Sequence, residues 1–378
     1  MSDRTRQWCD ALVAAALFLA CFGVVHTWFW AHGDLVDWPT YQAYGSAIVD
    51  QHRVPYRDFA VDYPPGALPV FVVPAWFGDY PNALEWVMAA CGVALVGVLA
   101  FVRREAAYYA ALAPILVGSL ILSRFDLWPA LLVAVALAAL LAGRDTVGWA
   151  FLGAAVAAKL WPLVIVPPAL LWSIRRGHAR SPLAGVAVAA LVFLPFVLIA
   201  PGGVWHTIGS QASRPLQVES IGAALFTTFG HPHVVTSHGS QNLAGHGAAA
   251  AVLSALGTLA VVAVWIAFAR GPVTRERFVR YAVAAACAFV AFDKVLSPQY
   301  LLWLIPIVPL VRGKRGVVAT GLLTLACVLT QVWFPERYFA YADDFHLAWV
   351  VLLRDLALVA LVVALVTPRR AHAPLRTP

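Results

Sequence analysis

Side chains that can bind phosphate or move a proton gather in a few short segments of this chain. The segments separate long apolar runs, in a sequence of which only 12% is charged: the stretch with Asp34 and Asp37, PYRDFAVDYPPG at 55–66, SRFD at 123–126, RPLQVES at 214–220, DKVLSPQY at 293–300 and PERYFAYADD at 335–344. Charged side chains cost free energy near lipid, so they usually face a bundle interior or a water-filled cavity. One such charge is often only a structural ion pair, whereas several segments together indicate a functional site.

The combination of residue types indicates group transfer from a phosphate-linked donor. Arginine binds phosphate through paired hydrogen bonds and lysine binds it as a point charge. A carboxylate among these cations can act as a general base. Transfer of a sugar from a lipid phosphate to a hydroxyl needs these parts, because the leaving phosphate is already a stable anion. Hydrolytic glycosidases, in contrast, use two carboxylates.

The composition places this chemistry in a membrane protein. Of the 378 residues 62% are hydrophobic, and the mean hydropathy is +0.79, whereas a soluble domain is nearer half apolar and a quarter charged. Runs of about 20 apolar residues are typical of transmembrane helices rather than of a barrel. The formal charge of +7 does not indicate a nucleic-acid site, because the basic residues lie in short clusters between apolar runs.

Two features at the level of single segments fit a polytopic chain. The first apolar run, from Ala11 to about Trp30, is interpreted as a helix and not as a signal peptide, because it is long and has no small-residue cleavage site. The cysteines are far apart and form no CxxC pair, so we interpret them as buried thiols: Cys9, Cys21, Cys91, Cys287 and Cys327.

Hydropathy predicts an all-α membrane bundle of about twelve helices, in one domain over residues 1–378. The expected spans are 9–31, 81–102, 105–122, 126–143, 147–158, 160–173, 182–200, 249–270, 278–293, 298–311, 315–333 and 345–366. The apolar piece at 66–78 is short for a span and is expected to be a juxtamembrane or re-entrant helix. It belongs to a first outer loop over 32–80.

The distribution of Lys and Arg predicts the topology. With twelve spans and a cytoplasmic N-terminus, 18 of the 26 basic residues fall on the cytoplasmic side, as the positive-inside rule requires. The weakest assignment is 147–173, which is either one long helix with Lys159 at its middle or a hairpin with Lys159 at its outer tip. Merging it would move every later basic cluster outside, so we predict the hairpin, cytoplasmic termini and an active site on the outer face.

The long outer loop at 201–248 is rich in Gly, His and Ser and exceeds what a connection needs, so we expect it to be functional or mobile. Its histidines invite a metal site, but their spacing is poor for a shared metal and no carboxylate lies near them in sequence: His231, His233, His238 and His246. We predict no metal ligands and no cofactor, and leave a divalent cation open.

Motifs along nearly the whole chain resemble the GT-C superfamily of polytopic glycosyltransferases, and most closely glycosyltransferase family 87. The matching segments are DWPTY (37–41), PYRDFAVDYPPG (55–66), RFDLWP (124–129), AKLWP (158–162), RPLQVES (214–220), LSPQYLLWL (296–304) and RY (337–338). The resemblance implies a bacterial plasma-membrane enzyme similar to polyprenyl-phosphate-mannose-dependent alpha-mannosyltransferases. It fixes neither the sugar nor the acceptor.

The resemblance also implies site residues. The catalytic carboxylate of the superfamily lies just after the first helix, where Asp37 fits and Asp34 is the rival. Asp62 stands where relatives often have Glu, and PYRDFAVDYPPG is expected to wrap the outer rim of the site. The expected lining residues are Arg57, Asp58, Asp62, Tyr63, Arg124, Asp126, Glu219, Gln299 and Tyr300. Arg57 and Asp58 have an equally good alternative as a salt-bridged loop anchor.

Four cations are candidates for the donor phosphate. Lys294 and Arg337 come first. Lys294 is favoured because DKVLSPQY directly follows an apolar helix and Pro298 can break the backbone there. Lys159 and Arg214 come next. Each of the four has the alternative of an interfacial charge that reaches to water.

The expected function is transfer of a sugar, mannose by resemblance alone, from a polyprenyl-phosphate donor to a lipid or glycan acceptor in cell-envelope biosynthesis. A nucleotide sugar is not the expected donor, because it stays in the cytoplasm. The main alternative is a transporter or flippase of lipid-linked sugars, which should show matched repeats and midplane charges; no repeat is visible here. A non-catalytic scaffold is the third hypothesis, and only activity separates it from the first.

Overall fold

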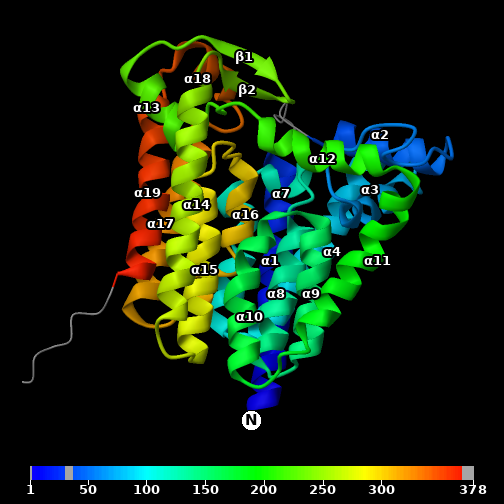
Figure 1. Cartoon of the computed structure of the whole chain (residues 1–378), viewed down its shortest axis with the longest axis vertical. Helices are drawn as coiled ribbons and strands as arrows, with labels where there is room; N and C mark the ends of the chain where they lie inside the picture. Colours follow the sequence, from blue (N-terminus) through cyan, green and yellow to red (C-terminus); the bar gives the residue numbers. More distant parts are fainter. Residues whose placement is uncertain (1, 30–36, 368–378) are drawn as a thin grey trace, which may run out of the picture.

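The computed structural model describes residues 2–29 and 37–367, which fold almost entirely as helices (Figure 1). The elements are α1 (Asp3–Phe29), α2 (Trp38–Val49), η2 (Pro65–Ala67), α3 (Leu68–Ala75), α4 (Tyr80–Val102), α5 (Arg104–Ala111), α6 (Ala113–Val117), α7 (Leu120–Ser123), α8 (Leu127–Leu141), α9 (Asp145–Ala158), η3 (Trp161–Ile165), α10 (Val166–Arg175), α11 (Pro182–Ile199), α12 (Pro201–Ser213), α13 (Ile221–Phe229), β1 (Val234–Ser237), β2 (Ser240–Leu243), α14 (Gly247–Ala269), α15 (Arg275–Ala291), η4 (Pro298–Tyr300), α16 (Leu301–Leu304), η5 (Val308–Leu310), α17 (Gly313–Trp333), α18 (Tyr338–Asp344) and α19 (Ala348–Val366).

The predicted all-α membrane bundle is confirmed. Within the described ranges six helices are long and apolar enough to cross a membrane: α1, α4, α11, α14, α17 and α19. Shorter apolar helices accompany them, among them α8 and α9. Each of the twelve predicted spans has a helix or a broken run of short helices at its place, as α5, α6 and α7 show for 105–122.

The segment 147–173 is a hairpin, as the charge distribution predicted. Near the start of α9, Asp145 pairs with Arg176 at 3.2 Å, just beyond the end of α10. One turn further on, Trp149 Nε1 donates to Ser173 Oγ at 3.0 Å. The two helices are therefore antiparallel, and Lys159 lies at the turn between them in an extended conformation.

The two ends of the bundle differ in what they carry. Figure 1 shows α2, α12, α13, α18 and the β1–β2 hairpin at one end, which we call the polar face, and the N-terminus at the other. This second end, the basic face, holds the connections after α4, α10, α14 and η5, with their arginines. That the basic face is cytoplasmic stays a prediction.

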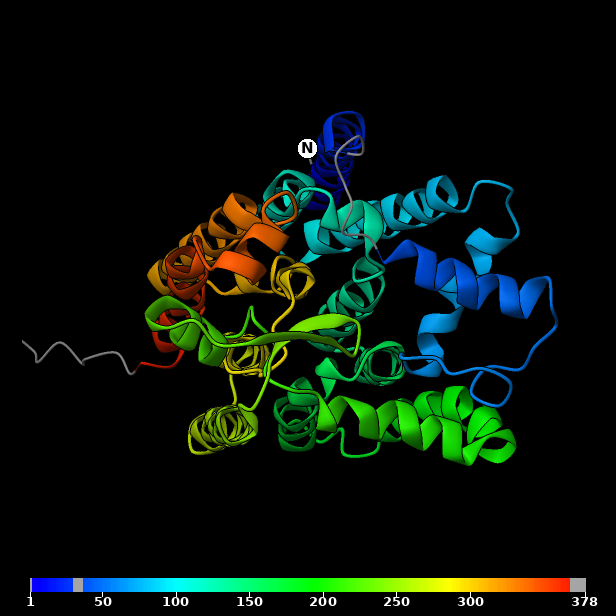
Figure 2. The same cartoon turned by 90° about the horizontal axis from the view of Figure 1, so that it is seen from above.

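The segment 201–248 is not a plain loop but contains α12, α13 and the β1–β2 hairpin. The turn of the hairpin is formed by His238 and Gly239, both with positive φ (52° and 68°). Two such residues are what a tight two-residue hairpin turn requires. The hairpin also pairs with the chain before α13, because Leu243 N donates to Leu216 O at 2.9 Å. Viewed from above, it runs across the bundle (Figure 2).

The proline-rich segment 55–66 is fastened to the bundle at its end. Pro65 starts η2, and the carbonyl of Gly66 accepts a 3.0 Å hydrogen bond from Trp128 Nε1. A Cβ on Gly66 would lie 2.6 Å from the carbonyl carbon of Ala157, so only glycine fits against the end of α9. On the other side, Thr207 Oγ1 of α12 donates to Val61 O at 2.7 Å. The segment is thus a fixed rim of the polar face.

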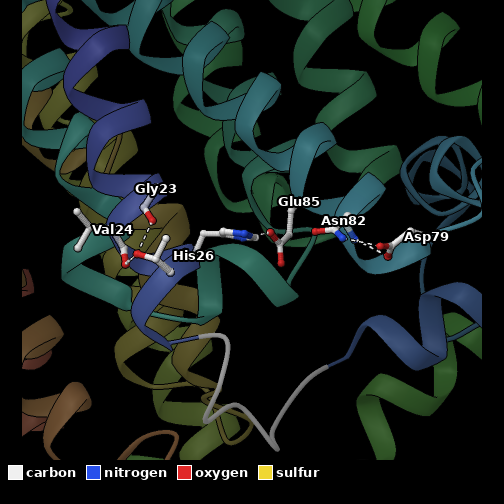
Figure 3. A network of polar contacts seen from close by, with 7 residues as sticks. Gly23, Val24, His26, Asp79, Asn82 and Glu85 are labelled. Carbon is white, nitrogen blue, oxygen red and sulfur yellow. Dashed lines mark hydrogen bonds and ion pairs between the residues drawn. The ribbon is translucent and has the colours of Figure 1, made fainter.

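A polar contact near the polar face joins the end of α1 to α4. His26 Nδ1 lies 2.6 Å from Glu85 Oε2, and Glu85 is buried. Figure 3 shows this pair beside the start of α4, where the Asp79 side chain caps the helix by accepting from Asn82 N. The contact fixes the end of α1.

Candidate active site

Four separate helix ends bring a cluster of charged side chains together at the polar face. Asp37 precedes α2, Arg124 and Asp126 lie between α7 and α8, and Lys159 ends α9. Trp303 of α16 completes the group through a hydrogen bond to Asp126. We call these five residues the polar-face cluster. Four of them, all except Trp303, were predicted site residues, from segments that are far apart in the sequence.

Asp37 and Arg124 form an ion pair in the cluster. The Tyr41 hydroxyl donates to Asp37 Oδ2 at 3.2 Å, one helical turn along α2. The Asp37 side chain keeps 31% of its surface exposed, whereas the Arg124 side chain keeps 9%. Burial lowers the pKa of Arg124 to about 10, although Asp126 and Glu219 oppose the effect. Asp37 is thus a carboxylate that a substrate can reach, oriented by two donors.

Asp126 and Lys159 form the buried half of the cluster. Lys159 Nζ lies 2.6 Å from Asp126 Oδ1, and Trp303 Nε1 donates to the same oxygen at 2.6 Å. Asp126 is fully buried, and its Oδ2 has no hydrogen-bond partner among the described residues. A buried charge needs such compensation, because its transfer from water is costly.

Aromatic rings surround the Lys159 ammonium group. Its Nζ lies 4.7 Å from the ring centre of Phe125, 5.0 Å from that of Trp303 and 5.7 Å from that of Tyr63. Tyr300 stacks on Trp303 at 3.9 Å and is also near the ammonium. These cation–π contacts and the Asp126 carboxylate hold Lys159 in place. Phosphate binding by Lys159 stays a prediction, and its position here is that of a structural charge.

Glu219 lies buried beside the cluster, in the RPLQVES segment. The segment is held from several sides: Gln217 N donates to Lys294 O at 3.0 Å, and Arg354 Nη2 of α19 donates to Glu219 O at 2.7 Å. Tyr341 of α18 donates to Val218 O at 2.6 Å. Burial raises the pKa of the Glu219 carboxyl from 4.5 to about 7, so near neutral pH this group is poised between its two charge states.

We expect Glu219 to make stability depend on pH. The folded state keeps the proton up to about pH 7, whereas the unfolded chain releases it near pH 4.5. The contribution of Glu219 is therefore fully present below pH 4.5 and is lost as the pH rises toward 7. Thermal melting of wild type and Glu219→Gln across this range should show a steeper loss in wild type. Equal slopes of melting temperature against pH for both proteins would show that Glu219 does not make stability depend on pH.

Other predicted site residues lie in contacts of their own. Arg57 Nε pairs with Asp58 Oδ1 at 2.9 Å, and Asp58 also accepts from Val54 N at 2.7 Å. This arrangement is the loop anchor that the sequence left as an alternative. Asp62 is exposed and accepts from the Tyr44 hydroxyl at 3.0 Å, while Asp34 lies outside the described residues.

Of the remaining phosphate candidates, Arg214 and Lys294 lie near each other and near Asp293, whereas Arg337 does not join them. Lys294 Nζ donates to Ala212 O at 2.6 Å, and Arg337 Nη1 donates to Val332 O at 3.2 Å. Arg214 Nη2 donates to Ser240 Oγ at 3.0 Å. Arg214 is the nearest of these to the cluster, since its charge acts on Lys159. Gln299 accepts from Ser297 Oγ in its own turn.

The sequence reasoning did not single out Trp303 or Tyr41. Trp303 lies inside the LSPQYLLWL motif, but a Trp at a span end is also typical of an interfacial belt. Its indole donates instead to the buried Asp126. Tyr41 is the last residue of DWPTY, and its spacing of four from Asp37 is the available signal, because that spacing places both on one helix face.

Among the described residues no group of three or more His, Cys, Asp and Glu side chains could hold a metal ion. Two cavities stand out, and neither is lined by the polar-face cluster. One, of about 190 Å³, lies beside Arg337 and Trp333. The other, of about 170 Å³, is on the basic face.

Comparison with known proteins gives a family. The model of glycosyltransferase family 87 matches residues 59–298, a range that includes Arg124, Asp126, Lys159 and Glu219 and begins after Asp37. A crystal structure of ArnT from Cupriavidus metallidurans bound to undecaprenyl phosphate is similar, with 15% identity, a TM-score of 0.48, and coverage of 93% of this chain and 76% of that chain. No curated protein matches. Because the family model covers well over half of the sequence, this chain belongs to glycosyltransferase family 87.

Proposed function

We propose that this membrane glycosyltransferase moves a sugar from a polyprenyl phosphate to a hydroxyl acceptor at the polar face, with Asp37 as general base. The observation that carries the proposal is the pairing of the partly exposed Asp37 with the buried Arg124. One group can take a proton and the other can bind phosphate. Both lie at helix ends that the surrounding packing fixes.

The proposed step needs no further reactant. Asp37 takes the proton of the acceptor hydroxyl while the hydroxyl oxygen forms a bond to the anomeric carbon of the sugar. The bond between that carbon and the donor phosphate oxygen breaks, and its electron pair leaves with the polyprenyl phosphate. A cation near the leaving oxygen stabilises the developing charge, and Arg124 is the group that we assign to it.

The ion pair suggests an order of events. In the free protein Arg124 binds Asp37, so the carboxylate already has a partner. A donor phosphate competes with Asp37 for the same guanidinium, so donor binding frees the carboxylate for the acceptor. We assign Arg214 as a second cation, because it is near Lys159 and Asp293. Lys294 and Arg337 remain predicted ligands of the donor phosphate.

The finer assignment rests on sequence resemblance. Mannose is the proposed sugar, and the proposed acceptor is a glycolipid or glycan of a bacterial cell envelope. The proposed orientation puts the polar face outside the plasma membrane, because the basic face then lies in the cytoplasm. The rival function is a flippase for the same donor, which would move the lipid across the bilayer without breaking the sugar–phosphate bond.

Proteoliposomes separate the two functions. Purified protein is reconstituted with radiolabelled polyprenyl-phosphate mannose in one leaflet, with and without lipid extract as acceptor. The proposal expects label in a new glycolipid and free polyprenyl phosphate in equal amount. Label that only changes leaflet, with the donor chemically intact, would establish the flippase instead.

A further inference from the structure

The cavity on the basic face lies at the opposite end of the bundle from the polar-face cluster. Its charged lining is Arg103, Arg275, Glu276 and Arg312, and its volume is about 170 Å³. We propose that this cavity binds the phosphate headgroup of an anionic membrane lipid. The proposal is independent of the sugar-transfer function.

The arginines of the cavity differ in whether their guanidinium groups have partners within the protein. Arg103 Nη1 donates to Pro309 O at 2.8 Å, and its Nε lies 3.2 Å from Glu105. The side chains of Arg275 and Arg312, in contrast, are exposed and make no hydrogen bond or ion pair with the described residues. Two guanidinium groups are therefore available to a ligand, and a guanidinium binds phosphate oxygens in pairs.

Other arginines of the basic face, in contrast to Arg275 and Arg312, donate to backbone carbonyl groups. Arg175 Nη2 donates to Ala269 O at 2.9 Å, and Arg277 Nη2 donates to Ala267 O at 2.9 Å. Both satisfy carbonyl groups at the end of α14, as basic residues often do at helix C-termini. They serve the fold, whereas Arg275 and Arg312 have no such carbonyl partner among the described residues.

Helix ends add to the positive potential of the cavity. Arg275 is the first residue of α15, and Arg312 immediately precedes α17. The start of a helix carries a partial positive charge and exposes backbone N–H groups, which favour an anion. Of these two helices, only α15 has an acidic side chain in its first turn, Glu276. The local balance is therefore positive.

The apolar part of the lining selects a lipid over a free anion. Val102, Leu141, Val279 and Leu310 line the same cavity. A lipid can place its phosphate between the two arginines and its glycerol and first acyl carbons on these side chains. Basic pockets between transmembrane helices of this kind bind anionic headgroups. An inorganic phosphate ion would gain nothing from the apolar walls.

The test is lipid binding by native mass spectrometry of the full chain, with phosphatidylglycerol, phosphatidylcholine and inorganic phosphate offered separately. We expect one tightly bound phosphatidylglycerol on wild type and an affinity about 30-fold lower for Arg275→Gln/Arg312→Gln. The matched control is Arg4→Gln/Arg6→Gln, which removes the same charge from exposed positions of α1. This control should bind as wild type does.

Three results would overturn the proposal. Equal binding by wild type and Arg275→Gln/Arg312→Gln would show that the cavity is not the site. Equal losses in that variant and in the control would assign binding to the overall charge of the face. Inorganic phosphate or phosphatidylcholine that bound as tightly as phosphatidylglycerol would exclude an anionic lipid as the ligand. Circular dichroism of each variant shows that a lost site is not a lost fold.

Discussion

Replacing Asp126 by Leu is expected to lower the folding stability more than other single changes in the polar-face cluster. The change leaves the Lys159 ammonium buried without its carboxylate, and it removes the acceptor of Trp303 Nε1. Removal of one member of a buried ion pair costs about 3–5 kcal/mol, because the remaining charge is uncompensated. Thermal melting in lipid nanodiscs should show a transition several degrees lower, with less folded protein recovered.

A second variant tells whether the charge pair itself is responsible. Asp126→Leu combined with Lys159→Met removes both charges and should recover most of the lost stability, because apolar replacement of a buried pair is often neutral. Asp58→Leu is the surface control, since its partner Arg57 is exposed and a solvent-exposed pair contributes little to stability. If Asp126→Leu melted at the same temperature as wild type, Lys159 would not depend on Asp126 to compensate its buried charge.

Asp37→Asn is expected to slow sugar transfer at least about 100-fold, the usual effect of losing a general base. Asparagine keeps the shape of the side chain and can still accept from Tyr41 and Arg124. It cannot take the proton of the acceptor hydroxyl. Initial rates with saturating donor and acceptor, measured for purified wild type and variant in nanodiscs, give the ratio directly.

The matched control for Asp37→Asn is Asp50→Asn. Asp50 is exposed at the other end of α2, and no side-chain hydrogen bond or ion pair joins it to a described residue. Its variant should transfer sugar at the wild-type rate. If Asp37→Asn also kept that rate, the general base would have to be sought at Asp34 or Asp62.

The sequence predicted the transmembrane part of the fold well, because lipid imposes a length and a charge rule on each span. The hairpin over 147–173 is the clearest case. Neither of its halves is long, yet the arginines that follow it required two crossings, and Asp145 and Arg176 now show the antiparallel pairing. The same rules say nothing of the segments at the polar face. There α2, α12 and α13 form in stretches that we expected to be loops.

The site was predicted as a set of residues and not as a set of pairs. Asp37 and Arg124 are 87 positions apart, and Asp126 and Lys159 are 33 apart, so no local spacing reveals either contact. Lys159 was predicted to bind the donor phosphate because it is a cation at the tip of the 147–173 hairpin. Its partner and its aromatic surroundings come from α8 and α16, which only the folded bundle brings to it.

The sequence did not predict a binding site on the basic face. The arginines of this face were interpreted as topology signals, and Arg175 and Arg277 donate to carbonyl groups at the end of α14. The sequence could not show that Arg275 and Arg312 border one cavity with apolar walls, because they lie in different connections. Charge counts alone do not distinguish a binding site from an orientation signal.

The most direct test of the central claim is product analysis with purified wild type in nanodiscs, given polyprenyl-phosphate mannose or a nucleotide-linked mannose and a lipid acceptor extract. Mass spectrometry counts the glycosylated acceptor and the released carrier. The account predicts one polyprenyl phosphate released for each sugar transferred, and no product from the nucleotide-linked donor. Transfer from the nucleotide-linked donor, or no transfer from any lipid-phosphate sugar, would contradict it.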